Sequence, residues 1–112
     1  MKKITVTGML MVCLSATSAM AQNCEVPQTL WERPRSGMAV LAQPALRQCV
    51  QAWMSKPAAQ LVVHHSNSEQ SQLQAAELRY WLIALAIDGD RIELMEDLRQ
   101  NELMNMEIRE PQ

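Results

Sequence analysis

A cluster of side chains that could do chemistry lies in the middle of the chain. His64 and His65 follow the apolar run 61–63, and the polar run 66–68 comes directly after them. Imidazole and hydroxyl groups can serve as base and nucleophile, as metal ligands, or as hydrogen-bond partners of a polar ligand. Nucleophilic catalysis also needs a group that orients the base, and the sequence marks none. We therefore predict that the protein is not an enzyme.

Met104 and Met106 form a second candidate cluster. Residues two apart lie on the same face of a β-strand, and thioether ligands suit Cu(I). A copper-handling protein that uses His64, His65 and this methionine pair is therefore the alternative function. Adjacent histidines on a strand point to opposite faces, so one metal cannot take both. Methionines in a chain without Phe are more simply core fillers, and we expect no metal or other cofactor.

The residues from 58 to 95 must position the two histidines. Val62 and Val63 favour a strand over Gln60–His64, and Arg91–Met95 alternates as a second strand does. Between them, apolar residues recur at helical spacing in two rows, so the face toward the core is expected to be wide: Leu73, Ala76, Tyr80, Ala84 and Ile87, and Leu78, Trp81, Leu82 and Leu85. Because such a helix usually connects parallel strands, the stretch predicts a β-α-β unit with parallel strands.

Local signals set the expected ends of this helix. Ser66 and Glu69 have the S-x-x-E spacing of a capping box, which predicts that the helix is capped at Ser66. Beyond the helix, Gly89 is the expected position for a left-handed cap.

The flanking segments complete the predicted fold. Pro44 predicts the first turn of another helix, with Pro57 ending it and one face holding Leu46, Cys49, Val50 and Trp53. Thr29–Glu32 is at best a short strand. Met104–Ile108 alternates as a last strand does, paired as a hairpin with Arg91–Met95 or inserted elsewhere in the sheet. We therefore expect an α/β fold, an α+β sandwich in which two helices pack on one face of a small mixed sheet, in the order β-α-β-α-β-β.

The first 21 residues have the pattern of a secretory signal peptide. Lys2 and Lys3 precede an apolar run, and Ala19-Met20-Ala21 supplies a small-x-small cleavage site. The apolar run is well short of the roughly 20 residues that a bilayer requires. We expect residues 1–21 to be removed and residues 22–112 to form a single exported domain without stable membrane insertion.

Charge excludes one class of partner. Loss of Lys2 and Lys3 would change the formal net charge from −2 to −4, and from Asp88 onward eight carboxylates stand against three arginines. An acidic segment of this kind is typical of a solvated surface. Since no basic stripe exists, we expect no nucleic acid partner.

Two of the three cysteines follow the predicted signal peptide. Cys24 and Cys49 form an even pair in an exported chain, which predicts a disulfide between them. The polar arm 22–29 would then be pinned to the body of the domain.

The middle and end of the chain resemble the OmpA-like domain, a periplasmic module that holds peptidoglycan non-covalently in many bacterial envelope proteins. Residues 62–67, VVHHSN, stand where the family has a strand and a G-H-T-D type turn. Residues 81–87, WLIALAI, stand at its Y-L-x-x-x-G-I position, and residues 105–108, NMEI, are similar to its closing R-V-E-I strand. The resemblance covers most of residues 31–109 and implies an OmpA-like fold and a periplasmic location.

The resemblance also implies a binding site. In the family, an Asp in the turn and an Arg at the helix start bind the charged ends of diaminopimelate through charge-assisted hydrogen bonds. The matching positions here are Asn67 and Gln74, so two amides replace the ionic pair. The implied function is a non-catalytic envelope module that binds peptidoglycan weakly or acts as an adaptor in an envelope protein assembly. The expected groove for the ligand or partner is formed by His65, Asn67, Ser68, Gln74 and Arg79.

Overall fold

The computed structural model describes residues 22–56 and 58–111. Its elements, in chain order, are β1 (Gln22–Glu25), a 3-10 turn η1 (Gln28–Glu32), α1 (Gly37–Leu41), α2 (Pro44–Met54), β2 (Gln60–Ser66), α3 (Glu69–Ala84), a second 3-10 turn η2 (Gly89–Arg91), β3 (Ile92–Leu98) and β4 (Asn105–Arg109). The signal peptide predicted over residues 1–21 and the helix stop predicted at Pro57 lie outside the described residues.

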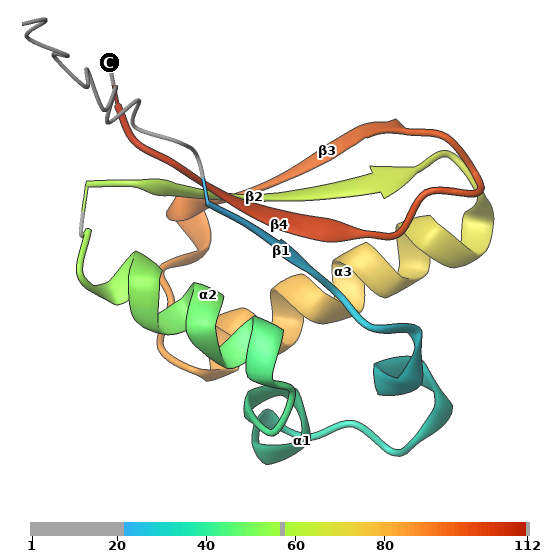
Figure 1. The fold of residues 1–112 in the computed structure, drawn as a ribbon, viewed down its shortest axis with the longest axis horizontal. Coiled ribbons are helices and arrows are strands. Elements are labelled where there is room, and N and C mark those ends of the chain that lie inside the picture. Colours follow the sequence, from blue (N-terminus) through green and yellow to red (C-terminus); the bar gives the residue numbers. More distant parts are fainter. Residues whose placement is uncertain (1–21, 57, 112) are drawn as a thin grey trace, which may run out of the picture.

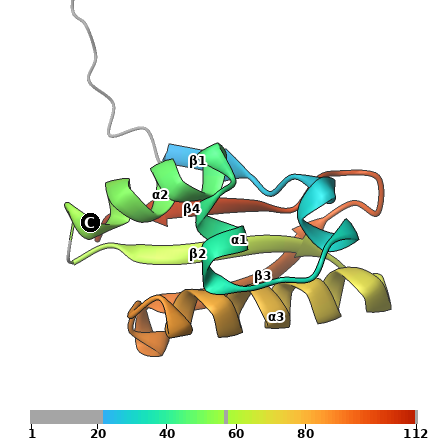
Figure 2. The ribbon, with the colours of Figure 1, turned by 90° about the horizontal axis from the view of Figure 1, so that it is seen from below.

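The four strands form one mixed sheet in the order β1-β4-β2-β3. β2 and β3 are parallel, whereas β4 is antiparallel to both β1 and β2. The helices lie on one face of this sheet, α2 against β1 and β4 and α3 against β2 and β3, which leaves the opposite face open (Figures 1 and 2). The predictions of a compact α+β fold, a mixed sheet and a parallel β-α-β unit are therefore confirmed.

The ends of the sheet differ from the sequence expectation. The arm before Pro27 forms β1, which pairs with β4, while Thr29–Glu32 belongs to η1, so the prediction of a strand there is wrong. β4 is inserted between β1 and β2, the second of the two arrangements left open by its period-two pattern. Residues 22–56 and 58–111 contain three α-helices where two were expected, because a short α1 precedes α2.

Residues of α2 form a helix for the expected reasons. Pro44 stands in the first turn, where its missing N–H costs nothing, and the residues facing the core are Leu46, Cys49, Val50 and Trp53, as predicted. Cys49 forms a disulfide with Cys24 of β1, with 6.0 Å between their Cα atoms. The predicted disulfide is confirmed, and closing a loop of this length stabilises a fold by about 3 to 4 kcal/mol.

The capping of α3 differs from both predictions. The N-cap is Ser68, whose side chain accepts a hydrogen bond from the Ser71 N–H, so the capping box at Ser66 is wrong. At the other end the chain enters the left-handed region at Ala86, with φ of 74°. Hydrogen bonds from Ala86 N to Ile83 O and from Ile87 N to Leu82 O complete a Schellman motif. The left-handed cap therefore falls on an alanine and not on Gly89.

The buried face of α3 is narrower than predicted. Only Ala75, Leu78 and Leu82 of this helix are buried, and Leu73 and Tyr80 are 65% and 64% exposed. The prediction that both apolar rows face the core is thus wrong for the four members of the first row within the helix, whereas its last member, Ile87, lies beyond the helix end and is buried. One helix resting on a sheet presents a single stripe to it, and Leu78 and Leu82 already fill that stripe.

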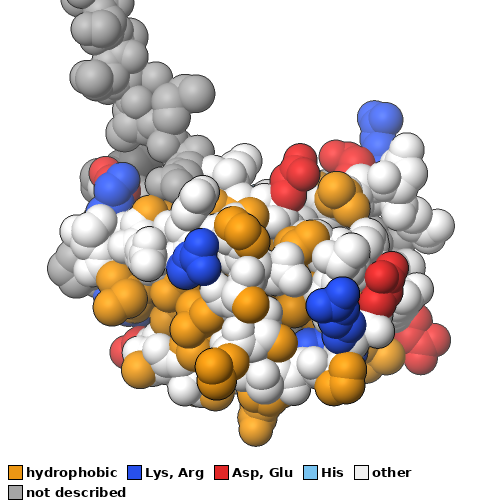
Figure 3. Space-filling model, turned by 60° about the horizontal axis from the view of Figure 1, so that its bottom comes forward, with side chains coloured by type: hydrophobic (Ala, Val, Ile, Leu, Met, Phe, Trp, Pro, Cys, Tyr) orange, Lys and Arg blue, Asp and Glu red, His pale blue; other side chains and the backbone are white. Residues whose placement is uncertain are grey.

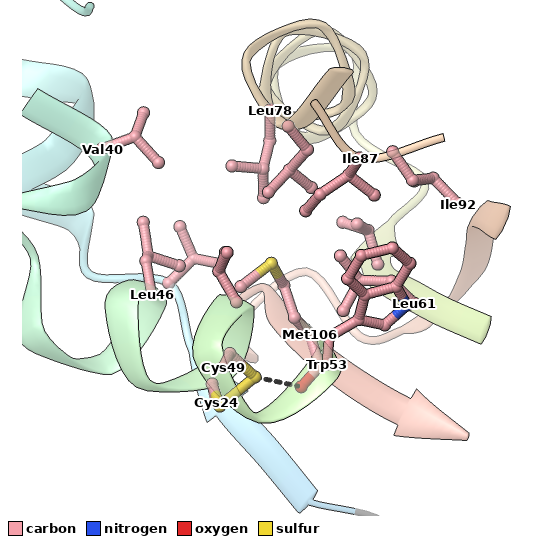
Figure 4. Packing of buried hydrophobic residues seen from close by; sticks show 14 of the residues in the cluster. Cys24, Val40, Leu46, Cys49, Trp53, Leu61, Leu78, Ile87, Ile92 and Met106 are labelled. Carbon is pink, nitrogen blue, oxygen red and sulfur yellow. Dashed lines mark hydrogen bonds between the residues drawn. A yellow bond between two sulfur atoms is a disulfide. The ribbon is translucent and has the colours of Figure 1, made fainter. Parts of the chain in front are cut away.

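The core lies between the helices and the sheet. Figure 4 shows Val40 and Leu46 pointing toward Leu78 of α3. Met106 of β4 extends into the middle of this cluster, and the Cys24–Cys49 disulfide lies at its edge. Across the part of the chain that the structure describes, no helix has both the length and the apolar character needed to cross a bilayer.

Candidate functional site

A polar cleft lies where β2 ends and α3 begins. It encloses about 110 Å³ and is lined by Val26, Gln28, Trp31, Ser66, Ser68, Gln70, Ser71, Gln74, Gln100, Glu102 and Met104. Most of these side chains carry neutral amides or hydroxyls, which can both donate and accept hydrogen bonds. Because sites for drug-sized molecules usually measure about 300 to 1,000 Å³, the cleft fits one small polar group of a larger ligand.

A serine network holds one wall of the cleft in place. The Ser66 and Ser68 hydroxyls lie 3.2 Å apart, and Ser68 Oγ accepts from Ser71 N at 3.1 Å. The Ser71 hydroxyl in turn accepts from the Ser66 N–H at 3.0 Å, so the strand end and the first helical turn are joined. These bonds fix the backbone that presents the lining hydroxyls.

A neighbouring hollow of about 170 Å³ shares Trp31, Gln70 and Gln74 with the cleft, and its other lining residues are Arg35, Leu73 and Glu77. Arg35 binds the Glu77 carboxylate through two nitrogens, and its guanidinium lies 5.6 Å from the centre of the Trp31 ring. The hydrogen bond from Arg35 holds the pKa of Glu77 below its ordinary value. This ion pair anchors η1, and with it Trp31, to α3.

The structure brings some of the predicted groove residues together and separates others. Ser68 and Gln74 line the cleft, and exposed Asn67 lies beside it, with its Oδ1 accepting from Gln100 Nε2 at 3.3 Å. His65 is buried and does not line the cleft, and its Nδ1 lies 2.9 Å from the Ser66 backbone carbonyl oxygen. Arg79 is directed away, and its Nη2 donates to the Gly89 carbonyl at 3.1 Å.

His64 and two carboxylates form a second polar cluster, on the open face of the sheet. The Nδ1 atom of His64 lies 2.8 Å from Asp97 Oδ2, and the Nε2 atom of His64 lies 2.8 Å from Glu107 Oε1. Partial burial lowers the pKa of His64, but the hydrogen bonds to Glu107 and Asp97 outweigh it, and the pKa lies above its ordinary value. Each ring nitrogen is thus engaged by a carboxylate oxygen, so neither is free to ligate a metal in this arrangement.

The residues of the copper alternative do not converge. His64 points to the open face, whereas Met104 and Met106 are buried in the core on the helix side, as core fillers would be. Within residues 22–56 and 58–111, no three His, Cys, Asp or Glu side chains are grouped to hold a metal ion.

Several lining residues were not identified from the sequence. Gln28, Gln100 and Glu102 come from turns far from α3, and only the sheet order brings them to the end of β2. The many polar residues between positions 66 and 74 did indicate the wall of the cleft that α3 forms, whereas Trp31 could be recognised only as an aromatic residue next to a turn.

In comparisons with known proteins, no family model, curated protein or solved structure matched the chain.

Proposed function

We propose that the protein is a non-catalytic module of the bacterial cell envelope, exported to the periplasm, that binds peptidoglycan weakly through the polar cleft. The observation that carries this proposal is the lining of the cleft, in which hydroxyls and side-chain amides surround one aromatic ring, Trp31. Peptidoglycan is rich in hydroxyls, amides and acetamido groups, which such a lining can hydrogen-bond.

The position of the cleft adds support through the OmpA-like resemblance. Asn67 and Gln74, at the positions matching the family's Asp and Arg, lie beside and within the same cleft. Their neutral amides can hydrogen-bond the peptide stem but cannot form charge-assisted contacts with its ionised groups. Since a hydrogen bond to a charged partner contributes about 1.5 to 3 kcal/mol, we expect weaker binding than in a module that keeps the ionic pair.

Trp31 gives the proposal its second contact. The indole is partly buried, the Arg35 guanidinium lies over its ring, and Arg35 Nη1 donates to the Trp31 backbone carbonyl, so Arg35 restrains both the ring and its backbone. An aromatic face of this kind packs against the apolar face of a sugar ring. A glycan strand could thus lie against Trp31 while a polar substituent enters the cleft.

Co-sedimentation with purified sacculi tests this function. The chain Gln22–Gln112 should be enriched in the sacculus pellet over an inert resin, and Gln74→Ala should reduce the enrichment severalfold. Gln51→Ala, which removes an exposed amide from α2, is the matched control and should behave as the wild type. Equal recovery on sacculi and resin would overturn peptidoglycan binding and leave the adaptor role to be sought with a protein partner.

A further inference from the structure

The turn between β3 and β4 forms one wall of the cleft and has few contacts of its own. Residues 99–103 are all exposed, and two of them, Gln100 and Glu102, line the cleft. Hydrogen bonds within the turn join Arg99 to Glu102, and Gln100 reaches Asn67 at 3.3 Å. A segment with so little burial opens easily unless its ends are held. The strands on either side therefore decide how firmly this wall is ordered.

His64 connects the two strands that enter and leave this turn. The ring of His64 lies between Asp97, near the end of β3, and Glu107, near the start of β4, 2.8 Å from a carboxylate oxygen of each. The strand that carries His64, β2, lies between β3 and β4 in the sheet. Hydrophobic side chains are numerous on the helix-bearing side of the molecule (Figure 3), whereas these three polar side chains lie on the opposite face. They thus span the base of the turn.

Asp97 is held by its side chain more than by its backbone. Residues 65 and 66 of β2 pair with residues 96 and 98 of β3, which leaves Asp97 as the extra residue of a β-bulge. Such a residue is unpaired in the ladder, and the bulge re-aims its side chain. β3 is also at the edge of the sheet. In the described part of the chain, the Asp97 carboxylate has no hydrogen-bond partner besides His64, so this contact fixes the end of β3.

Loss of the proton from His64 must release one of the two carboxylates. A charged imidazole donates from both nitrogens, whereas a neutral one donates from one nitrogen and has a lone pair on the other, which repels a carboxylate oxygen. The Glu107 side chain is only 15% exposed and is also bound by Arg109 at 2.9 Å, so its contact with the ring is the one retained. The Asp97 side chain, 43% exposed, is the one released.

We propose that His64 is a proton-dependent clamp on the turn 99–103. At low pH the charged ring fastens Asp97 and with it the end of β3. At high pH the released Asp97 lets the turn loosen, together with the cleft wall that it forms. The wall built on Ser66, Ser68 and Ser71 is joined by hydrogen bonds between these serines and stays in place. The order of the cleft is in this way linked to pH.

The surrounding charges set the pH at which the clamp opens. Charged side chains come to this face from the strands around His64: Glu93 and Asp97 of β3, Glu107 and Arg109 of β4, and Glu25 of β1. Carboxylates outnumber the arginine, which favours the charged ring. Partial burial lowers the pKa of His64, but the hydrogen bonds to Glu107 and Asp97 outweigh it, and the pKa lies above 6.5. The clamp is therefore closed below pH 6.5 and is lost as pH rises through the raised pKa.

NMR relaxation of the backbone Cα–H groups in the isotope-labelled, ligand-free chain Gln22–Gln112 tests the clamp. These groups, unlike amide protons, do not exchange with water at high pH. Order parameters of residues 99–103 should fall from about 0.85 at about pH 5.5 to below about 0.6 at about pH 9, the difference between a rigid and a flexible backbone. The midpoint should coincide with the titration of the His64 imidazole. Order parameters that stay constant across this range would overturn the proposal.

Two variants of β3 separate the clamp from a general effect of charge. Asp97→Ala removes the contact with His64, so the turn should be flexible at the lower pH already and should not change further. Glu93→Ala, the matched control, removes an exposed carboxylate from the same strand and face and should keep the change with pH. A turn that stays ordered in Asp97→Ala, or loss of the pH dependence in both variants, would contradict the clamp.

Far-UV circular dichroism checks that each variant folds. No ligand enters these measurements, so the clamp can fail without affecting the proposed binding of peptidoglycan, and the reverse.

Discussion

At the scale of single residues, most of the cleft lining is made of neutral groups whose positions are fixed by other neutral groups. Ser68 serves both as the N-cap of α3 and as part of the lining, so the residue that begins the helix also faces the cleft. Glu102 is the single carboxylate in that lining, and its Oε1 accepts from the Arg99 N–H at 2.9 Å. In the proposed function, selectivity would therefore come from hydrogen-bond geometry and from Trp31 more than from charge.

Restoring charge at the two matching positions should strengthen peptidoglycan binding. The Asn67→Asp/Gln74→Arg variant would offer an ionic partner to each end of a zwitterionic group in the peptide stem. One charge-assisted contact is enough to tighten binding by about tenfold or more. Isothermal titration with a soluble peptidoglycan fragment measures the change, and the charge-reversed pair, Asn67→Arg/Gln74→Asp, is the control. Equal affinities for the two variants would contradict the assigned site.

His64 should make the free energy of unfolding depend on pH. Its pKa in the folded chain lies above the ordinary 6.5, so its contribution is fully present below that value and is lost as pH rises through the raised pKa. Burial raises the pKa of Glu107, but the hydrogen bonds from His64 and Arg109 lower it by more. The pKa of Glu107 therefore lies below its ordinary 4.5. The Glu107 contribution is thus present above pH 4.5 and is lost on acidification below it.

Urea unfolding at about pH 5.5 and about pH 9 measures this effect. His64→Gln should cost about 1 to 2 kcal/mol at the lower pH, since Asp97 is 43% exposed and its contact is screened. The cost should be smaller at the higher pH. The same cost at both values would show that the imidazolium does not contribute.

At the scale of elements, the structure could be predicted where a sequence pattern was compatible with a single arrangement. Val62 and Val63 with the following helix allowed only a parallel crossover, and the Pro44 helix had one apolar face. Prediction failed where several residues could satisfy the same signal. Ser66 and Ser68 are both acceptable caps, and the choice of Ser68 depends on contacts with Ser71 that no local pattern contains.

The exposed apolar residues of α3 show a second limit of sequence reasoning. Leu73 and Tyr80 have the spacing of core residues, but a helix on a two-layer fold has only one buried side, and the sequence does not say which apolar row takes it. Likewise, the alternation around Met106 predicts a strand but not its neighbours, because pairing between β1 and β2 is decided by the whole sheet. The α3 wall of the cleft was therefore predictable, whereas the turn residues Gln100 and Glu102 were not.

The end of α3 offers a test of local strain. Ala86 has φ of 74°, a region that costs a residue with a Cβ about 1 to 2 kcal/mol and that glycine adopts freely. Ala86→Gly should therefore raise the free energy of unfolding by about 0.5 to 1 kcal/mol. Ala84→Gly, in the last helical turn, is the matched control and should lower it by up to about 1 kcal/mol. Destabilisation by both changes would contradict the left-handed cap.

At the scale of the whole molecule, the sheet divides the surface into regions with separate properties. The open face carries the His64 cluster, the outward side of α3 carries exposed apolar residues, and the cleft lies at the end of β2. The disulfide joins β1 to α2 and so fixes the strand that leads to η1 and Trp31. The polar cleft and the exposed side of α3 therefore lie on separate parts of the surface.

The proposed peptidoglycan-binding site in the cleft is tested most directly by an NMR titration. A soluble disaccharide–peptide fragment of peptidoglycan, added to the isotope-labelled chain Gln22–Gln112, should shift the Trp31 indole resonance and the side-chain amides of Gln74 and Gln100. Resonances of His64 and its neighbours on the open face should stay in place. The absence of chemical-shift changes at millimolar concentrations of the fragment, or changes confined to the open face, would contradict the proposed binding site in the cleft.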